Sequence, residues 1–148
     1  VFPGQASQYV GMGKDLYESS TGVRKLYDLA SNLIGEDIGQ LSFEGPAEKI
    51  KETRYTQPAI LLHSLAVLTI LKGSLTEIEL TAGHSLGEYG SLALAGVLSF
   101  EDSVKAVVKR AALMEEACRN IPGTMAAIIG LEEEKIIEVC KNASAKGA

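Results

Sequence analysis

Cysteine is scarce in this 148-residue chain, in which only Cys118 and Cys140 occur. They lie too far apart for a CxxC pair, and no Cys or His cluster beside them has metal-ligand spacing. We therefore expect two reduced thiols and no metal site. Long hydrophobic runs are also missing. The most apolar stretch, residues 59–71, contains His63 and Ser64 and is shorter than the roughly 20 residues that span a bilayer, so we expect a buried helix there and no membrane contact.

Runs of basic residues are absent as well. The chain has 14 Lys and Arg against 19 Asp and Glu, a formal net charge of -5, and no Lys or Arg cluster interleaved with aromatic residues. This composition disfavours nucleic acid as a partner. A hydrophobic content of 46% argues against disorder, since it is enough to bury a real core. No signal-peptide pattern precedes the domain, so a cytoplasmic or organelle-matrix location is expected. The abrupt ends at Val1 and Ala148 indicate a segment cut from a longer protein.

Hydrophobic periodicity predicts helices in the first half of the chain. One helix ends near Gly35, a residue that suits a helix C-terminus. Another runs to Leu71 and is apolar nearly all round, as expected of a buried helix, with Pro58 in its first turn and Gly73 at its end. The apolar positions of the first helix are Val23, Leu26, Tyr27, Ala30, Leu33 and Ile34.

A strand, a tight turn and a helix are predicted in succession further on. Ile78, Leu80 and Ala82 alternate with polar neighbours, which is typical of a strand. They lead directly into residues 83–87, after which small and apolar residues continue to Gly96. The order of these elements is that of an α/β fold with a parallel sheet.

The last third of the chain predicts one more helix and then a new unit. Ser99 and Asp102 form a capping-box pattern, which marks a helix start, and Arg110 lies on the flank of this helix's apolar face. Residues 125–129 predict a strand and residues 132–141 a helix. We expect an α/β domain over 1–122 and the truncated start of an α+β subdomain over 123–148.

The sequence GHSLG at residues 83–87 matches GxSxG, the nucleophile elbow of hydrolase-like folds. The turn is so sharp that glycines suit its flanks, Gly83 and Gly87, and Ser85 projects from it. The backbone N–H of Leu86 then faces an oxyanion at a helix N-terminus. A bare GxSxG also occurs by chance in glycine-rich turns, so the predicted strand and helix on either side are what favours a catalytic serine.

Three segments and one arginine together resemble one known family. GHSLGEY at residues 83–89 resembles the GHSxGE signature of malonyl and related acyl-CoA transacylases, which include acyltransferase domains of fatty-acid and polyketide synthases. FPGQASQ at residues 2–8 resembles the family's FPGQGSQ, and YTQP at residues 55–58 its TQP segment. Arg110 stands where the family has its carboxylate-binding arginine. The resemblance covers essentially the whole chain, and it implies that residues 123–130 begin a ferredoxin-like subdomain.

The resemblance implies a role for each matching residue. Ser85 would be the nucleophile, and the backbone N–H groups of Leu86 and Gln5 would form the oxyanion hole. Arg110 would bind the free carboxylate of a malonyl group, for which a planar guanidinium is well shaped; from the sequence alone it reads as a solvated helix arginine. The catalytic histidine is expected outside this chain. His84 is part of the elbow but projects away from the serine, and His63 reads as a core histidine.

Two residues depart from the pattern or vary it. Ala6 stands where the family usually has glycine, so the turn after Gln5 must either avoid positive φ or carry strain. Gly90 is a milder variation in the first turn of the helix that follows the elbow.

The expected reaction is transfer of a malonyl group from coenzyme A to the phosphopantetheine thiol of acyl carrier protein, through an acyl-serine and without a cofactor. The partners would be malonyl-CoA and acyl carrier protein, in fatty-acid biosynthesis. Three alternatives stay open. They are an acyltransferase domain of a polyketide synthase, a serine esterase or thioesterase that uses water as acceptor, and a non-catalytic docking module that keeps the fold.

Overall fold

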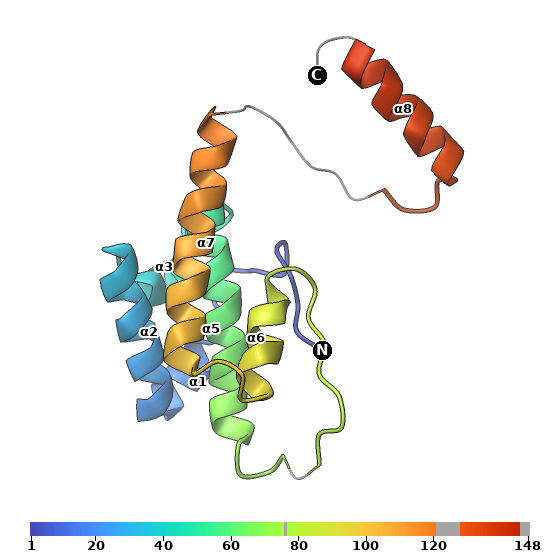
Figure 1. The fold of residues 1–148 in the computed structure, drawn as a ribbon. Helices are drawn as coiled ribbons and strands as arrows, with labels where there is room; N and C mark the ends of the chain where they lie inside the picture. Colours follow the sequence, from blue (N-terminus) through green and yellow to red (C-terminus); the bar gives the residue numbers. More distant parts are fainter. Residues whose placement is uncertain (76, 121–127, 146–148) are drawn as a thin grey trace. The chain divides into compact units, whose positions relative to one another are not determined.

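The computed structural model describes residues 1–75, 77–120 and 128–145, and the chain forms two compact units, Val1–Glu115 and Glu116–Ala148 (Figure 1). The second unit contains the end of α7 and all of α8. No described helix is both long enough and apolar enough to cross a membrane. The helices are α1 (Lys14–Ser19), α2 (Thr21–Ile34), α3 (Ile38–Glu44), α4 (Ala47–Ile50), α5 (Thr53–Leu71), α6 (Gly87–Leu94), α7 (Phe100–Asn120) and α8 (Glu133–Ala145).

Helix α5 is the centre of the first unit, where it contacts α1, α2, α3, α4 and α6 and lies beside α7 (Figure 1). Its apolar residues face all directions, so neighbours can cover it on every side. Leu62, Leu65 and Ala66 are fully buried. The expectation that Pro58 lies in the first turn is wrong, because α5 begins at Thr53. Pro58 cannot donate to the carbonyl four residues earlier, but the burial of this segment keeps the helix continuous.

Helix α2 confirms the prediction from periodicity. Ser20 caps its start by accepting a hydrogen bond from the Val23 backbone N–H, and the helix ends at Gly35 with φ of 77°. Val23, Tyr27 and Ala30 form its buried face. Glycine reaches this left-handed conformation without steric cost, so α2 can stop there.

The predicted strand at residues 78–82 is not formed in the described part of the chain. A single parallel bridge joins Phe2 to Gly83, with Phe2 N donating to Ala82 O at 2.8 Å and His84 N donating to Phe2 O at 3.1 Å. Leu80 is 91% exposed. A strand needs a partner along its length, and the described residues supply one only at Phe2. The expected strand at 125–129 lies mostly outside the described residues, and its last two positions, which are described, have no strand pairing.

The later helices follow the sequence signals. Asp102 N donates to Ser99 Oγ at 2.9 Å, and that hydroxyl donates to Asp102 Oδ2 at 2.7 Å. This capping box starts α7 at Phe100, as predicted. In the second unit, α8 confirms the helix expected near residues 132–141.

Candidate active site

Ser85 lies in a strained turn between the Phe2–Gly83 bridge and α6. Its φ is 52°, in the left-handed region that side chains other than glycine rarely adopt. Its side chain is exposed. The next residue, Leu86, is buried and precedes the first residue of α6, whose early N–H groups have no partner inside the helix. An exposed hydroxyl on a sharp turn that leads directly into a helix is the geometry of a nucleophile elbow.

Close backbone contacts explain the glycines of the turn. A Cβ on Gly83 would lie 2.0 Å from the carbonyl carbon of Gly87, and a Cβ on Gly87 would lie 2.3 Å from Phe2 O. No real Cβ tolerates such distances from backbone atoms. The absence of side chains at these two positions is therefore required by packing, in agreement with their assignment from the sequence.

The N-terminal segment packs directly on the elbow. Besides the bridge at Phe2, Gly4 contacts His84 so closely that a Cβ would lie 2.4 Å from His84 Nδ1. Gln5 is the next residue, so its backbone follows a segment fixed against the turn that carries Ser85. The structure thus brings together two segments about 80 residues apart, as the resemblance implied.

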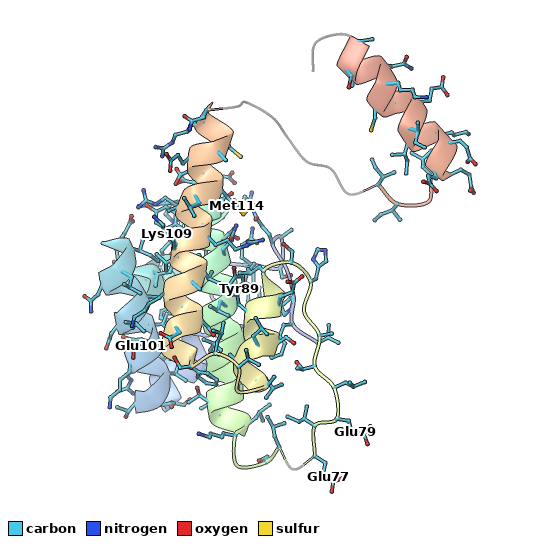
Figure 2. All side chains as sticks on the ribbon, viewed as in Figure 1. Glu77, Glu79, Tyr89, Glu101, Lys109 and Met114 are labelled. Atoms are coloured by element: carbon cyan, nitrogen blue, oxygen red, sulfur yellow. The ribbon has the colours of Figure 1, made fainter. Side chains whose placement is uncertain are left out.

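Arg110 reaches Ser85 from α7. Its Nη2 donates to Ser85 Oγ at 2.9 Å, and its Nη1 donates to Gln57 Oε1 at 2.5 Å. Gln57, in α5, is fully buried, and its Nε2 in turn donates to Met114 Sδ at 3.1 Å. Met114 lies one turn beyond Arg110 on α7 and is labelled in Figure 2. Arg110 is therefore held by hydrogen bonds to Ser85 and Gln57. It is not the solvated helix arginine that the sequence alone suggested.

The sequence did not reveal the roles of Gln57 and Met114. Gln57 belongs to the TQP segment, so the resemblance marked the position without assigning it a contact. The sequence alone assigned no contact to Met114, which lies in the same helix as Arg110. A spacing of four residues places Arg110 and Met114 on the same face of α7, which is a signal that points to a shared partner once Arg110 is suspected.

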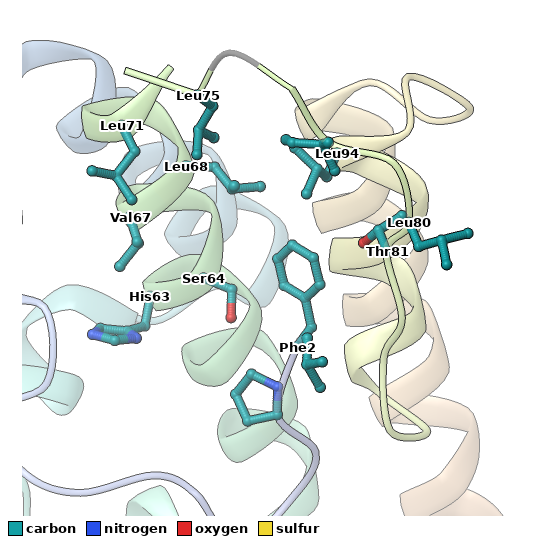
Figure 3. A pocket seen from close by; sticks show the side chains of 13 residues that line it. Phe2, His63, Ser64, Val67, Leu68, Leu71, Leu75, Leu80, Thr81 and Leu94 are labelled. Carbon is teal, nitrogen blue, oxygen red and sulfur yellow. The ribbon is translucent and has the colours of Figure 1, made fainter. Parts of the chain in front are cut away.

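Neither histidine bonds to Ser85 within the described residues, where Arg110 is the side chain that donates to its Oγ. His63 is half-buried, and burial lowers its pKa below the usual value against a weaker opposing effect of Asp15. It lines an apolar cavity of about 420 Å³ between α5 and the segment before the elbow, and its ring points away from Phe2 (Figure 3). His84 is exposed, with Nδ1 toward Gly4.

Ala6 and Gly90, the two residues that depart from or vary the family pattern, have different structural consequences. Ala6 has φ of 81°, so the turn after Gln5 carries strain and does not avoid positive φ. Gly90 is more than a mild variation, because a Cβ there would lie 2.5 Å from the Phe2 ring. The described residues contain no group of three or more His, Cys, Asp or Glu placed to hold a metal ion, and Cys118 and Cys140 are both free and exposed.

The site thus combines an exposed serine in a sharp turn before a helix with a guanidinium that bonds to its oxygen, the arrangement of the candidate nucleophile elbow. Comparison with known proteins shows the family. Residues 1–145 match the model of the acyl transferase domain family, and the chain belongs to that family. It is 44% identical over 147 residues to malonyl CoA-acyl carrier protein transacylase of Bacillus subtilis, covering 99% of this chain and 46% of the relative.

Solved structures agree with this relationship. An acyl carrier protein S-malonyltransferase from Vibrio cholerae superposes with a TM-score of 0.79 at 41% identity, covering 96% of this chain and 47% of the other. A malonyl-transacylase in complex with its type II PKS acyl-carrier protein gives 0.78 at 39% identity, covering 95% and 46%. These neighbours have an α/β fold. The chain thus spans about half the length of the relatives it matches.

Proposed function

We propose that the full-length protein transfers a malonyl group from coenzyme A to the thiol of acyl carrier protein through an ester on Ser85. The observation that carries this proposal is the 2.9 Å hydrogen bond from Arg110 Nη2 to Ser85 Oγ. It puts a permanent cation next to the nucleophile. An acyl group that also carries a free carboxylate, such as malonyl, would place that carboxylate there. A planar guanidinium can bind it through two parallel hydrogen bonds.

The proposed steps use three residues of this chain and one histidine outside it. Ser85 Oγ attacks the thioester carbonyl, and the N–H groups of Leu86 and Gln5 stabilise the oxyanion as charge develops. The C–S bond breaks, and coenzyme A leaves as a thiol with the proton that Ser85 gave up. The thiol of acyl carrier protein then attacks the ester carbonyl, the bond from that carbon to Ser85 Oγ breaks, and the thiol proton returns to Oγ as the malonyl group leaves on the carrier protein. A histidine outside this chain holds the proton between these steps.

The bridge at Phe2 and Gly83 supports a proposal about the complete fold. Its two extended segments run parallel, and Leu80 beside it is exposed. We assign both segments to a parallel sheet that further strands of the full-length protein complete. Residues 123–148 would begin a ferredoxin-like subdomain after the α/β domain of residues 1–122.

The names of the relatives support the choice of substrates. They are transacylases that use malonyl-CoA and acyl carrier protein, and one was solved with its carrier protein bound. By this proposal the protein acts in fatty-acid biosynthesis in the cytoplasm and uses no cofactor. An esterase would use the same elbow, but it has no need of a guanidinium held on the serine.

The test is acylation of the full-length protein with malonyl-CoA, followed by peptide mass spectrometry and an assay of thiol transfer. We expect malonate on Ser85, which acyl carrier protein removes faster than water does. Ser85→Ala should take up no label. Label on Cys118 or Cys140, or release by water alone, would overturn the proposal.

Substrate selectivity gives a second readout. Arg110→Ala should lower malonyl transfer by about 10-fold to 150-fold, the range for a hydrogen bond to a charged group, and lower acetyl transfer less. Only the malonyl group presents a carboxylate to the missing guanidinium. Equal losses for both substrates would show that Arg110 supports the fold instead.

A further inference from the structure

Gln57 joins the arginine of the site to a methionine. Its side chain is fully buried, and both ends of its amide bond to α7. Oε1 accepts from Arg110 Nη1 at 2.5 Å, and Nε2 donates to Met114 Sδ at 3.1 Å. A buried amide whose two ends are both used is fixed in one orientation.

The chemistry of the two partners makes that orientation specific. The guanidinium of Arg110 offers only donors, whereas the thioether of Met114 offers only an acceptor. If the amide of Gln57 turned over, its NH₂ would face the donors of Arg110 and its oxygen would face a sulfur that cannot donate. Both contacts would be lost in a buried position, where unpaired polar groups are costly.

Removal of the sulfur alone leaves the buried Nε2 of Gln57 without its acceptor. That amide would then move or rotate toward another acceptor, and Oε1 would move with it. Arg110 Nη1 would lose its fixed partner. Because the guanidinium is one rigid plane, displacement of Nη1 also displaces Nη2, which lies 2.9 Å from Ser85 Oγ.

We propose that Met114 is a positioning residue for the acyl group's carboxylate. It acts through Gln57 to aim the guanidinium of Arg110 at the space beside Ser85. This proposal rests on the proposed function, since it concerns selection of a malonyl group. It assigns Met114 a polar role that an apolar residue of equal size cannot replace.

The main variant is Met114→Leu in the full-length protein, because leucine has a similar volume and no acceptor. The loss of one hydrogen bond predicts a fall of about 2-fold to 12-fold in kcat/KM for malonyl-CoA. Transfer of an acetyl group should stay within about 2-fold of wild type, because acetyl has no carboxylate for the arginine. The ratio of malonyl to acetyl transfer therefore falls, which a general loss of stability would not cause.

Two further variants separate polarity from packing. Met12→Leu makes the same chemical change in the buried core, where Met12 is 2% exposed, and should leave the ratio unchanged. Met114→Gln supplies a carbonyl oxygen of similar reach and should restore the ratio at least in part. A ratio that Met114→Leu leaves unchanged, or that Met12→Leu lowers equally, would overturn the proposal.

The aim of the guanidinium can also be measured without malonyl-CoA. Phenylglyoxal modifies arginine side chains, and mass spectrometry of the peptide that contains Arg110 gives the rate at that residue. We expect faster modification in Met114→Leu than in wild type and in Met12→Leu, because Nη1 is no longer held. Equal rates would contradict the role of Met114. Failure of wild type to accept malonate would instead contradict the proposed function and leave this readout intact.

Discussion

Two residues of the molecule share an unusual backbone conformation but are held in it by different means. Ser85 has φ of 52° and Ala6 has φ of 81°, and both are side-chain-bearing residues in the left-handed region. Such a conformation costs roughly 1–2 kcal/mol for a residue other than glycine. The turn of Ser85 is enclosed by contacts between distant segments, whereas the turn of Ala6 is exposed.

Backbone atoms of the elbow and of the N-terminal segment leave no room for side chains at Gly83 and Gly87, on either side of Ser85. Gly83 lies against Gly87, and Gly87 lies against Phe2 O, at distances that no side chain could occupy. Around Ala6 the contacts are local: Ala6 N donates to Gln8 Oε1 at 3.0 Å, and Ser7 Oγ donates to Gly4 O at 2.8 Å. Strain imposed by tertiary packing persists and can serve function. Where only local bonds hold the strained residue, we expect glycine to replace it without loss of function.

The largest expected effect comes from Ser85→Gly, which separates strain from chemistry. Without the hydroxyl no acyl ester forms, so transfer by the full-length protein should fall by at least about 10,000-fold. Glycine adopts this conformation without the steric cost. We therefore expect the free energy of unfolding of this inactive variant to exceed that of Ser85→Ala by about 1 kcal/mol. Denaturant unfolding of both variants measures the difference.

Ser85→Ala is the matched control for that measurement, because it removes the same hydroxyl and its bond from Arg110 but keeps a Cβ. If the two variants are equally stable, the elbow carries no steric strain at Ser85, and the contrast with Ala6 disappears.

The second prediction concerns the packing that encloses the elbow. In Gly83→Ala the new methyl group would meet backbone atoms of Gly87 at about 2 Å, so the turn must open. We expect a loss of stability of about 3 kcal/mol or more, at or above the upper end for overpacking. Chemical denaturation followed by circular dichroism measures this change.

Gly73→Ala provides the control, because a Cβ on Gly73 would meet no atom within 4 Å. That variant should change stability by less than about 1 kcal/mol in either direction. Similar losses from both substitutions would show that the elbow is no more tightly packed than an open glycine site.

The elbow was predictable because its signals are local. The GxSxG pattern predicts the turn directly. A few neighbouring residues likewise predict the N-terminus of α6 and the capping box of α7. Helix α2 was predictable for the same reason, through its period and Gly35. These features depend on short stretches of sequence, whose preferences agree with the structure they form.

Features that depend on distant partners were not predictable from those local signals. The alternation of Ile78, Leu80 and Ala82 indicates a strand, but a strand also needs neighbours, and the described residues pair it only at Phe2. Pro58 suits the first turn of a helix, but α5 begins at Thr53, five residues earlier, in a segment that is buried by its neighbours. The bond from Gln57 to Arg110 joins residues 53 positions apart, so neither residue alone indicates it.

A third prediction tests how tightly the N-terminal segment is held on the elbow. In Gly90→Ala the methyl group would lie 2.5 Å from the Phe2 ring, a side chain that can shift slightly. We expect a destabilisation of about 1–3 kcal/mol, smaller than that of Gly83→Ala. Phe2→Leu should remove part of this cost, so the double variant should be more stable than the sum of the single effects predicts. Strict additivity in denaturation experiments would contradict direct contact.

The smallest expected effect is at Ala6, where the comparison can be completed. Ala6→Gly removes the steric cost of positive φ, about 1–2 kcal/mol, and adds about 0.4–1 kcal/mol of chain entropy to the unfolded state. The net result should be a stabilisation between about 0 and about 1.6 kcal/mol, centred on about 0.8 kcal/mol. Transfer activity should change by less than about 3-fold, because Gly4 and Phe2 hold the segment on the elbow from one side.

Ala6→Val is the opposing control, since a β-branched residue suits this conformation least, and it should lower stability. If Ala6→Gly is neutral in stability but lowers transfer strongly, the turn after Gln5 is held by the site itself, and its strain belongs with that of Ser85.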